Sequence, residues 1–530
     1  MTELAMGIDL GTSYTCVSII ENDIPVVIPN EWGERTHASV VSFMDDGRVL
    51  VGNDGKKQIV TNPENTVYSS KRILGRFFFA EEVRKARGVV PYNIVEGANN
   101  SVSVRIEDML YSPQEIAAII LKEMRAIVEN HTGQTVRKAV ITVPAYFNDN
   151  QRQATKDAGK IAGLEVLRII NEPTAAALTY GFGQGYQQRV ALYDLGGGTF
   201  DISILDIGDD VFEVISTAGD TYLGGDDFDD RIMHWLADSF EQQQGVDLRT
   251  NKYALQKLKE ASEKAKIGLS EHEKVQIHIP MVHTDEQGYA VDFSTTLART
   301  EFDQMVMDLV QRTFKVCDEA LQSAGLTASD INAIILVGGP TRLPIIRSSV
   351  RHYFQREPLV DVDPDEVVSM GAAIQGHALL GSQQSTFLLD VTPLSLRLAT
   401  VTDAKTGMTY TEEIIEKNTP IPIDRTRCFT TATDFQEKVR IKVLQGESPN
   451  ADQNELLGDF EFSGFRVAER GEVTIEVTFE IDTDGIVNVS ARDVETGARA
   501  STQVTLGAGL TDQDIEQAYA RNEQIELASR

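Results

Sequence analysis

Two glycine-rich segments of the same kind lie far apart in this chain. Residues 7–13 read GIDLGTS near its start, and residues 194–201 read DLGGGTFD in its middle. Each combines a carboxylate, accessible backbone N–H groups and a hydroxyl, which together can hold a nucleotide phosphate and its metal ion. The pair predicts a cleft between two related halves that close on one nucleotide from both sides.

The overall composition narrows the class of protein. The chain has 530 residues, enough for several domains of about 100 to 200 residues each. Its net charge of −31 opposes general binding to nucleic acids or anionic membranes, because both are negatively charged. The three widely spaced cysteines, Cys16, Cys317 and Cys428, favour reduced thiols over a disulfide framework. Because the sequence also has neither a basic, apolar leader nor a membrane-spanning apolar run, we expect a cytoplasmic protein.

Residues 1–381 show the alternation of strand and helix patterns that is typical of α/β architecture. Apolar runs predict buried strands at residues 139–143, 189–193 and 331–337. A helix is expected to begin after Ser112, because this serine is followed by a proline and, three residues on, by a glutamate.

The composition changes after residues 381–386 (GSQQST), which form a candidate linker. The apolar residues 387–389 (FLL) either dock on another part of the molecule or form an ordinary edge strand. From residue 390 to 506 apolar and polar residues alternate, and DTDG at residues 482–485 predicts a hairpin turn. We therefore expect an antiparallel β-sandwich, followed by one short helix that Thr511 caps.

Asp9 and Asp194 each end a predicted strand two residues before a glycine. Their carboxylates would point toward the loop and reach a hard cation such as Mg²⁺, which takes only one or two carboxylates. Glycine matters here because a Cβ would hold the loop backbone away from the phosphate oxygens. Residues 7–13 alone could form a plain turn. The run DLGGGTFD after a predicted strand is a far more specific signal of a phosphate-binding loop.

Six segments occur in an order that is characteristic of one family. They are residues 7–13 (GIDLGTS), 143–147 (VPAYF), 170–177 (INEPTAAA), 194–201 (DLGGGTFD), 337–344 (VGGPTRLP) and 388–396 (LLDVTPLSL). On these segments the chain resembles the 70-kDa heat-shock protein family of chaperones, the DnaK-like proteins, over nearly its whole length.

The resemblance implies an α/β, actin-like ATPase domain with a duplicated, ribonuclease-H-like core at residues 1–381, with ATP at the bottom of its cleft. Residues 382–392 would form an interdomain linker, residues 393–506 an all-β sandwich that binds peptides, and residues 507–530 the start of a helical lid. The family's usual lid has several helices, so we expect either a member without a lid or a shortened chain. Peptide release would then be faster than from a lidded relative.

The resemblance also assigns the chemistry of ATP hydrolysis. The catalytic residues would be Lys71, Glu172, Asp194, Thr199 and Asp201, with Lys71 placing the attacking water. Asp9 and Asp194 would hold Mg²⁺, and K⁺ is a further candidate cation. The phosphates of ATP or ADP would meet Gly11, Thr12, Ser13, Tyr14, Gly196, Gly197 and Gly198. Ser13 replaces the family's usual threonine but keeps a hydroxyl, and Lys71 by itself would be read as a surface lysine.

For the nucleoside, the family's contacts correspond to Gly225, Glu263, Lys266, Ser270, Gly338, Gly339, Arg342 and Asp365. Without the resemblance, Glu263 and Lys266 would be read as a solvated ion pair, because they lie three residues apart on one predicted helix. Pro340 departs from the polar residue often found at its position and lacks a backbone N–H, so no hydrogen bond from its backbone is expected.

In the sandwich, Leu398, Phe429, Val439 and Ile441 match the family's hydrophobic peptide pocket. Val401 and Ala432 match the pair that arches over the bound peptide backbone, although a larger methionine often stands in place of Val401. Judged by spacing alone, Val439 and Ile441 would be core residues on one strand face. Residues 403–411 are longer than the corresponding segment of the family.

Coupling between the two parts would run through Pro144, Arg152, Lys156, Arg168, Glu172, Leu388, Leu389 and Asp390. Arg168, Asn171 and Asp390 match positions at which J-domain co-chaperones act. The implied partners are unfolded polypeptides, a J-domain co-chaperone and a nucleotide exchange factor, with no nucleic acid and no membrane, and we expect a monomer.

Three functions fit these features to different degrees. The first is an ATP-dependent chaperone that binds exposed hydrophobic segments of unfolded proteins. The second is a regulatory or signalling adaptor of the same family with a narrow client range. The third is an actin-like filament protein or a sugar kinase, against which the separate sandwich counts.

Overall fold

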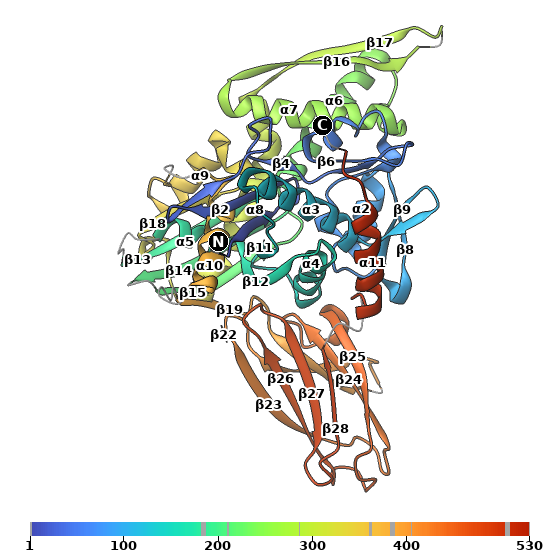
Figure 1. Ribbon diagram of the computed structural model, residues 1–530, viewed down its shortest axis with the longest axis vertical. Helices are drawn as coiled ribbons and strands as arrows, with labels where there is room; N and C mark the ends of the chain where they lie inside the picture. The colour runs from blue at the N-terminus through green and yellow to red at the C-terminus, as the bar shows by residue number, and fades with distance from the viewer. Residues whose placement is uncertain are drawn as a thin grey trace.

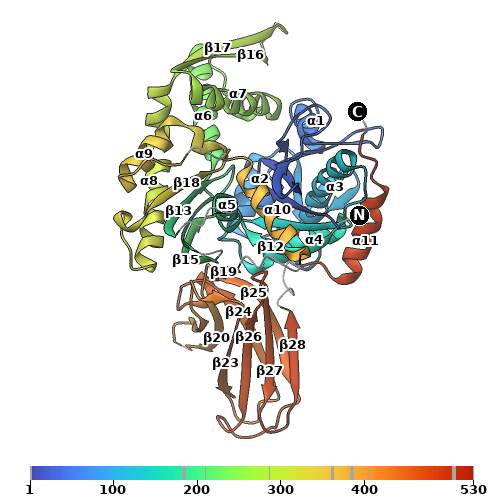
Figure 2. The same ribbon diagram turned by 60° about the vertical axis from the view of Figure 1, so that its left-hand side comes forward.

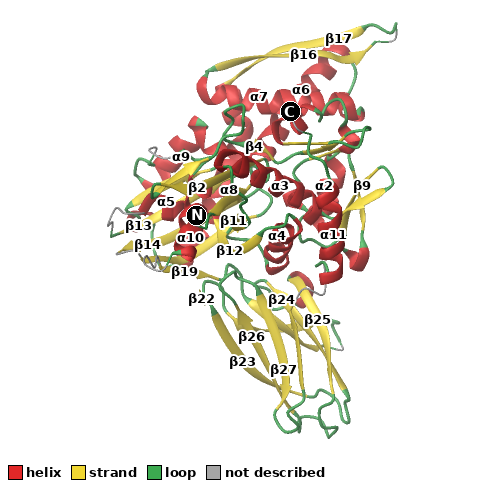
Figure 3. Cartoon of the chain, in the orientation of Figure 1, coloured by secondary structure: helices red, strands yellow, loops and turns green. Residues whose placement is uncertain are grey.

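The computed structural model describes residues 3–181, 187–208, 211–285, 287–359, 363–381, 387–403, 405–503 and 509–528. Figure 1 shows a helix-rich part built around sheets, with an elongated part made of strands below it. The lower part consists almost entirely of strands and loops (Figure 3). The described residues therefore combine an α/β part with an all-β part.

Two six-stranded sheets form the centre of the α/β part. The first contains β12 (Glu165–Asn171), β11 (Lys138–Val143), β1 (Ala5–Leu10), β2 (Tyr14–Glu21) and β3 (Ile24–Val27), with β4 (His37–Ala38) beside β2. The second contains β18 (Ala333–Val337), β13 (Gln188–Leu195), β14 (Phe200–Gly208), β15 (Val211–Asp220), β19 (Phe387–Val391) and β22 (Pro420–Ile421). The three buried strands expected from the sequence are confirmed, the last of them beginning at Ala333.

The two sheets share one plan. In each, three consecutive antiparallel strands are joined on one side by a parallel strand, β11 beside β1 and β18 beside β13. Each glycine-rich segment forms the turn between the first two of these antiparallel strands, at residues 11–13 and 196–199. The two loops therefore occupy equivalent positions in the two sheets.

Helices surround the sheets. They are α1 (Gly52–Lys57), α2 (Glu81–Val89), α3 (Pro113–Thr132), α4 (Asp149–Ile161), α5 (Glu172–Gly181), α6 (Gly225–Gln244), α7 (Lys252–Glu271), α8 (Arg299–Ser323), α9 (Pro344–Phe354) and α10 (Val367–Leu380). We call the first sheet with α1–α4 the first lobe, and the second sheet with α6–α9 the second lobe, because each has its own hydrophobic core.

Helices α5 and α10 pack between the two sheets, as Figure 2 shows. Their close approach depends on residues without a side chain. A Cβ on Gly371 would lie 1.7 Å from the carbonyl oxygen of Ala175, and one on Gly7 would lie 2.0 Å from the backbone nitrogen of Ala373. Glycine at these positions lets α10 lie against both α5 and β1, which brings the two glycine-rich loops close together.

The expected start of α3 is confirmed. The Ser112 hydroxyl accepts a hydrogen bond from the Glu115 backbone N–H, and the Glu115 carboxylate accepts one from the Ser112 backbone N–H. The backbone N–H groups of Ser112 and Glu115 are therefore both satisfied at this helix end.

Three smaller sheets complete the α/β part. They are β6 (Val49–Val51), β5 (Val41–Phe43) and β7 (Thr66–Val67); β10 (Met109–Tyr111), β9 (Val102–Ile106) and β8 (Asn93–Glu96); and β16 (Lys274–Thr284) with β17 (Ala290–Ala298). The β16–β17 hairpin projects away from the rest of the second lobe (Figures 1 and 2).

The all-β part consists of two four-stranded antiparallel sheets. One contains β21 (Thr409–Ile415), β20 (Leu396–Thr402), β24 (Lys438–Gln445) and β25 (Glu455–Ser463), and the other β23 (Ile423–Thr430), β26 (Thr474–Ile481), β27 (Val487–Asp493) and β28 (Arg499–Gln503). Along β26, Ile475, Val477, Phe479 and Ile481 are buried in the shared core. The expected sandwich and its hairpin after Ile481 are confirmed.

Strand β19 joins the two parts. It pairs in parallel with β15 of the second sheet, and its Asp390 and Val391 pair with β22. Residues 387–389 therefore dock on the α/β part as a strand beside β15, the first of the two alternatives drawn from the sequence, and β19 is not an edge strand because β22 follows it in the sheet. Leu388 packs against the core between the lobes, whereas Leu389 is 40% exposed. The preceding residues of the expected linker, 382–386, lie outside the described residues.

The hairpin turn between β26 and β27 docks on the first lobe. One carboxylate oxygen of Asp484 accepts from Lys156 Nζ at 2.5 Å, and the other accepts from the Ile169 backbone N–H at 3.1 Å. Asp149 accepts from the Val487 backbone N–H at 2.6 Å. The contacts of β19 with the second lobe and of this turn with the first are among those that position the sandwich.

The helix expected after Thr511 is also confirmed. It is α11 (Asp512–Gln524), with a reciprocal cap between Thr511 and Asp514. It lies against α3 and α4 of the first lobe, along the flank of the α/β part (Figure 1). Among the described residues, no helix is both long and apolar enough to cross a membrane.

Asp149 makes the docking of the sandwich turn sensitive to pH. Burial raises the pKa of its carboxyl from 3.8 to about 7, and its second oxygen has no hydrogen-bond partner among the described residues. Because the folded state prefers the neutral acid, the stability that this group contributes is full below pH 3.8, falls as pH rises toward about 7, and is absent above it.

We predict that Asp149→Asn raises the melting temperature at pH 8 by roughly 2 °C or more, and by less at pH 5, where the parent chain already holds the neutral acid. The amide still offers an oxygen to the Val487 N–H. Thermal melting of both chains at the two pH values measures the difference. Glu165→Gln, at an exposed position of β12, serves as the control. An equal difference at both pH values would contradict the assignment.

Candidate functional site

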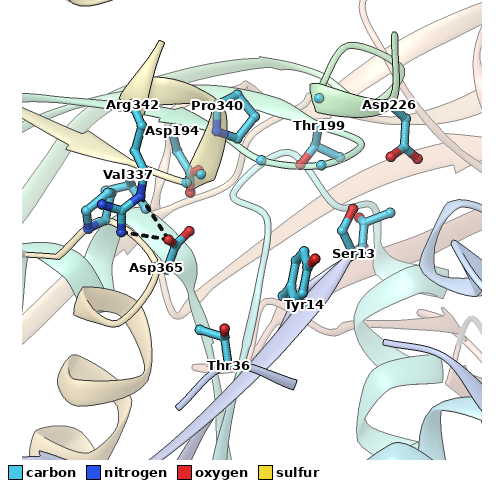
Figure 4. Close-up of a pocket in the computed structure, with 18 of the residues that line it drawn as sticks. Ser13, Tyr14, Thr36, Asp194, Thr199, Asp226, Val337, Pro340, Arg342 and Asp365 are labelled. Atoms are coloured by element: carbon cyan, nitrogen blue, oxygen red, sulfur yellow. Dashed lines mark hydrogen bonds and ion pairs between the residues drawn. The ribbon is translucent and has the colours of Figure 1, made fainter. Parts of the chain in front are cut away.

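A cavity of about 380 Å³ lies between the two lobes, beside the glycine-rich loops. The loops after β1 and β13 line it on two sides, and α6, α7 and the segment after β18 close it. Figure 4 shows Ser13 and Thr199 facing each other across this space, with Arg342 and Asp365 joined at its far side. The cavity thus occupies the cleft that the two loops predicted.

The loops fit together only because they lack side chains. A Cβ on Gly197 would lie 2.0 Å from the Ser13 hydroxyl, and one on Gly11 would lie 2.1 Å from the Tyr14 carbonyl oxygen. A Cβ on Gly198 would lie 2.9 Å from both Arg72 and Thr12. The absence of side chains thus lets the two loop backbones approach each other across the cleft.

Four carboxylates and one lysine lie under the loops, and of the carboxylates Glu172, Asp194 and Asp201 are buried while Asp9 is partly buried. Lys71 Nζ pairs with Glu172 at 2.7 Å, and both side chains are buried. Burial, together with the charge of Glu172, raises the pKa of Asp9 to about 7 and that of Asp201 to about 8. The same two causes raise the pKa of Asp194 well above its usual range. Four carboxyl groups share a single lysine, so a bound cation would lower these raised pKa values and stabilise the ionised carboxylates.

The residues present fit a magnesium ion. One oxygen of Asp194 is buried and has no hydrogen-bond partner among the described residues, while Asp9 accepts a hydrogen bond from Thr142 at 3.1 Å. The described residues contain no group of three or more His, Cys, Asp or Glu side chains that could hold a metal. Mg²⁺ usually takes one or two carboxylates and completes its shell with water and phosphate.

Most of the residues expected around the nucleotide line the cavity. They are Asp9, Gly11, Thr12, Ser13, Tyr14, Lys71, Glu172, Asp194, Gly196, Gly197, Thr199, Gly225, Glu263, Lys266, Ser270, Gly338, Gly339, Arg342 and Asp365. Gly198 and Asp201 lie just behind this lining. Asp201 stands opposite Asp194 in the β13–β14 pair and accepts a hydrogen bond from the Tyr146 N–H at 3.1 Å.

The ion pair that spacing suggested between Glu263 and Lys266 is wrong. Lys266 Nζ instead lies 2.7 Å from Asp229 and donates to the Gly225 carbonyl at 3.0 Å. Glu263 faces the first lobe, where Lys56 Nζ lies 2.7 Å from it. Partners from other elements replace the local pair because both side chains lie at the interface between elements rather than in solvent.

Sequence reasoning missed several residues of the site. Thr36, Asp226 and Asp229 also line the cavity, as does Pro340, whose position the sequence analysis had already noted. The run GGDDFD at residues 224–229 carried a signal, since glycines followed by acidic residues begin α6. Thr36 had none. Pro340, from which no backbone hydrogen bond was expected, contributes its ring, which a Cβ on Gly225 would approach to 2.9 Å.

Lys56 was also missed, and it bridges the lobes above the cavity. Its Nζ lies 2.7 Å from both the Glu263 carboxylate and the Tyr14 hydroxyl, and Tyr14 donates to Glu263 at 3.1 Å. Lys56 is on α1 of the first lobe and Glu263 on α7 of the second. These three side chains form a bridge across the mouth of the cleft.

The residues expected to bind peptide lie in the sandwich. Leu398 and Ile441 are buried in its core, Phe429 and Val439 are partly buried against that core, and Val401 and Ala432 are exposed. Val439 and Ile441 share one face of β24, as alternation predicts. Their role in peptide binding stays a prediction.

Several of the residues expected to couple the two parts take part in hydrogen bonds between the cavity and the sandwich. Arg152 donates to Asn171 at 2.7 Å and to the carbonyl of Ala145, next to Pro144, at 3.0 Å. Asp390 accepts hydrogen bonds from Asn171 at 2.7 Å and from Thr174 at 3.1 Å. Arg168 reaches the Thr483 carbonyl at 3.5 Å. Since Asn171 directly precedes Glu172, the network ends at the partner of Lys71.

The comparison with known families agrees with this arrangement. Residues 5–529 match the model of the family described as Hsp70 protein. The match covers nearly the whole of the 530-residue chain, including both glycine-rich loops, β19 and the sandwich. The chain therefore belongs to the Hsp70 family.

Proposed function

We propose that this protein is an ATP-dependent chaperone that binds exposed hydrophobic segments of unfolded polypeptides and releases them in a cycle driven by ATP hydrolysis. Membership of the Hsp70 family supports a chaperone role in general. The observation that carries the coupled cycle is the adjacency of two residues: Glu172 pairs with Lys71 in the cavity, and Asn171 donates to Asp390 at the start of the sandwich.

On this proposal the α/β part is an actin-like ATPase domain. ATP would lie with its phosphates between the two glycine-rich loops and its base near Arg342, which Asp363 and Asp365 hold at 2.5 and 2.8 Å. Mg²⁺ on Asp9 or Asp194 would neutralise phosphate charge when bound. Lys71, fixed by Glu172, would orient the attacking water and stabilise charge that develops on the γ-phosphate, and Thr199 would position that phosphate.

In the proposed mechanism Lys71 and Thr199 act by orienting the reacting groups. Loss of either side chain should therefore slow ATP turnover more than it weakens ATP binding. We predict that Lys71→Ala or Thr199→Ala lowers the steady-state ATPase rate by on the order of 100-fold while ATP binding stays measurable. Lys85→Ala is the matched control, because that lysine pairs with Glu81 on the exposed face of α2. Turnover at the parent rate in both cavity variants would refute the catalytic roles.

The sandwich would hold the peptide by backbone pairing and by one apolar pocket around Val439. We predict that Val439→Phe fills this pocket and weakens binding of a Leu-centred peptide about tenfold, which corresponds to 1.4 kcal/mol. Fluorescence anisotropy of a labelled peptide measures the affinity. Lys438→Gln, on the opposite face of β24, should leave it unchanged. An unchanged affinity of the Val439 variant would place the pocket elsewhere.

The partners that we propose are a J-domain co-chaperone, a nucleotide exchange factor and unfolded polypeptides. We also propose a cytoplasmic protein; its free cysteines Cys16, Cys317 and Cys428 are compatible with a reducing compartment. The competing role, an adaptor with a narrow client range, differs in the number of peptide sequences that the protein would bind. Such an adaptor would bind few sequences from a library of unfolded peptides, whereas a general chaperone would bind many.

One experiment tests the whole cycle. The steady-state ATPase rate is measured alone, with an unfolded peptide, and with a J-domain protein. We predict that each addition raises the rate, because each would act through the Asn171–Asp390 contact on the position of Glu172. A measurable basal rate that neither addition changes would contradict a coupled chaperone cycle.

A further inference from the structure

Strand β23 forms one edge of its four-stranded sheet in the sandwich. It pairs with β26 from Ile423 to Thr430, and the order of that sheet is β23, β26, β27 and β28. Figure 1 shows β23 along one side of the all-β part. Phe429, which belongs to the proposed peptide pocket, lies near the end of this strand. The side chains that precede Phe429 are therefore neighbours of that pocket.

Two arginines, Arg425 and Arg427, share the face of β23 that carries Phe429. Their partners on β26 are all buried in the sandwich core: Ile475 lies opposite Phe429, Val477 opposite Arg427 and Phe479 opposite Arg425. Directly opposed residues of an antiparallel pair point to the same face of the sheet. Both arginines therefore point to the inner face of β23, toward the other sheet of the sandwich.

Although they point inward, both arginines are exposed. Each residue of 424–428 is exposed, on both faces of the strand, whereas Ile423 and Phe429 on either side of this stretch are partly buried. Strand β21 of the other sheet lies beside β23 but does not cover this stretch. The flank of the sandwich is therefore open between these two strands, directly beside Phe429.

This open flank is basic. Within the part of the chain that the structure describes, neither arginine takes part in an ion pair, and Arg425 donates to the carbonyl of its neighbour Asp424 at 3.1 Å. Glu412 on β21 also points inward, because it lies opposite the buried Leu398, yet it pairs with neither arginine. Two guanidinium groups against one carboxylate leave a local positive charge in a chain whose net charge is −31.

The charge changes sign on the other side of Phe429. Residues 431–437 connect β23 to β24 and contain two exposed carboxylates, Asp434 and Glu437, and no basic residue. Val439, the second pocket residue on this side, follows them on β24. The proposed pocket thus lies between a basic stretch of strand and an acidic turn.

The spacing along β23 suits an extended peptide. Residues two apart on a strand lie about 7 Å apart, so the Arg427 side chain reaches the space beside Phe429. In a bound extended peptide, a residue two or three positions from the apolar one lies at a similar range. A carboxylate there could pair with a guanidinium group, which favours planar, bidentate contacts.

On the basis of the proposed peptide binding, we propose that Arg425 and Arg427 determine specificity: the sandwich selects unfolded segments with an acidic residue close to the apolar residue that enters the pocket. The acidic residue lies on the β23 side of the pocket, because Asp434 and Glu437 repel it on the other side. Such charge complementarity discriminates between segments more than it raises affinity in general.

The test compares labelled peptides that differ in one residue. Each has a central Leu and carries Asp, Asn or Lys three positions before or after it, and fluorescence anisotropy gives the affinity. We predict that, at one or both positions, the parent chain binds the Asp peptide about fivefold more tightly than the Lys peptide, as expected for exposed ion pairs. The difference should shrink at about 1 M salt, where the Debye length is about 3 Å.

Two variants assign the preference to the arginines. The double change Arg425→Gln and Arg427→Gln should bring the Asp and Lys peptides to equal affinity, and Arg427→Glu should favour the Lys peptide. Arg492→Gln is the matched control, because this exposed arginine lies opposite Glu476 on the outer face of the same sheet. Melting temperatures near that of the parent show that the variants are folded.

A parent chain that binds the Asp and Lys peptides equally at both positions, or prefers Lys at both, would overturn the proposal. So would a preference for Asp that survives in the double variant. If that variant keeps the preference and only aggregates more readily, the arginines protect a free sheet edge from other chains and do not select peptides. A parent chain that binds none of the peptides would contradict the peptide site itself, whereas equal binding of all of them contradicts only this inference.

Discussion

The hydrogen bond from Asn171 to Asp390 is the contact on which the arrangement of the molecule depends. Asp390 lies in β19, which continues into the sandwich, and Asn171 ends β12 of the first lobe. Burial raises the pKa of Asp390, and Arg152 and three hydrogen-bond donors oppose that shift. A buried carboxylate without these partners would be costly, so the docked sandwich and the ordered network require each other.

The same chain segment extends this constraint into the nucleotide cavity. Glu172 follows Asn171 and holds Lys71 in a buried pair, while Asp9, Asp194 and Asp201 add negative charge around it. This excess of carboxylates is unfavourable by itself and becomes favourable when a cation and phosphates enter. Binding at the cavity and docking of the sandwich therefore act on one peptide unit. We consider this the physical basis for the proposed coupling.

Much of this organisation could be predicted from the sequence. Alternation in β26, the cap at Ser112 and the glycine-rich loops are local signals, and the residues that carry them lie where they were expected. The family match adds the broad assignment over residues 5–529. The nineteen cavity residues that were foreseen come mainly from segments with a family motif.

What could not be predicted depends on contacts between distant elements. Lys56 had no local signal, because its partners Tyr14 and Glu263 come from two other elements of the chain. Spacing gave Lys266 the wrong partner for the same reason, since Asp229 reaches it from α6. The position of α11 on α3 and α4 depends on Lys122 and Ile161, far from it in sequence. Short-range patterns carry no information about such pairs.

The central claim, that the nucleotide cavity and the sandwich are linked through β19, is tested most directly by hydrogen exchange of the backbone amides of residues 388–390. The amides are compared with ATP bound, in a Thr199→Ala chain to prevent hydrolysis, and with ADP bound. We predict that exchange differs clearly between the two nucleotides, because the proposed coupling makes the pairing of β19 with β15 depend on the nucleotide that is bound. Identical exchange with both nucleotides, in a chain that binds both, would contradict the link.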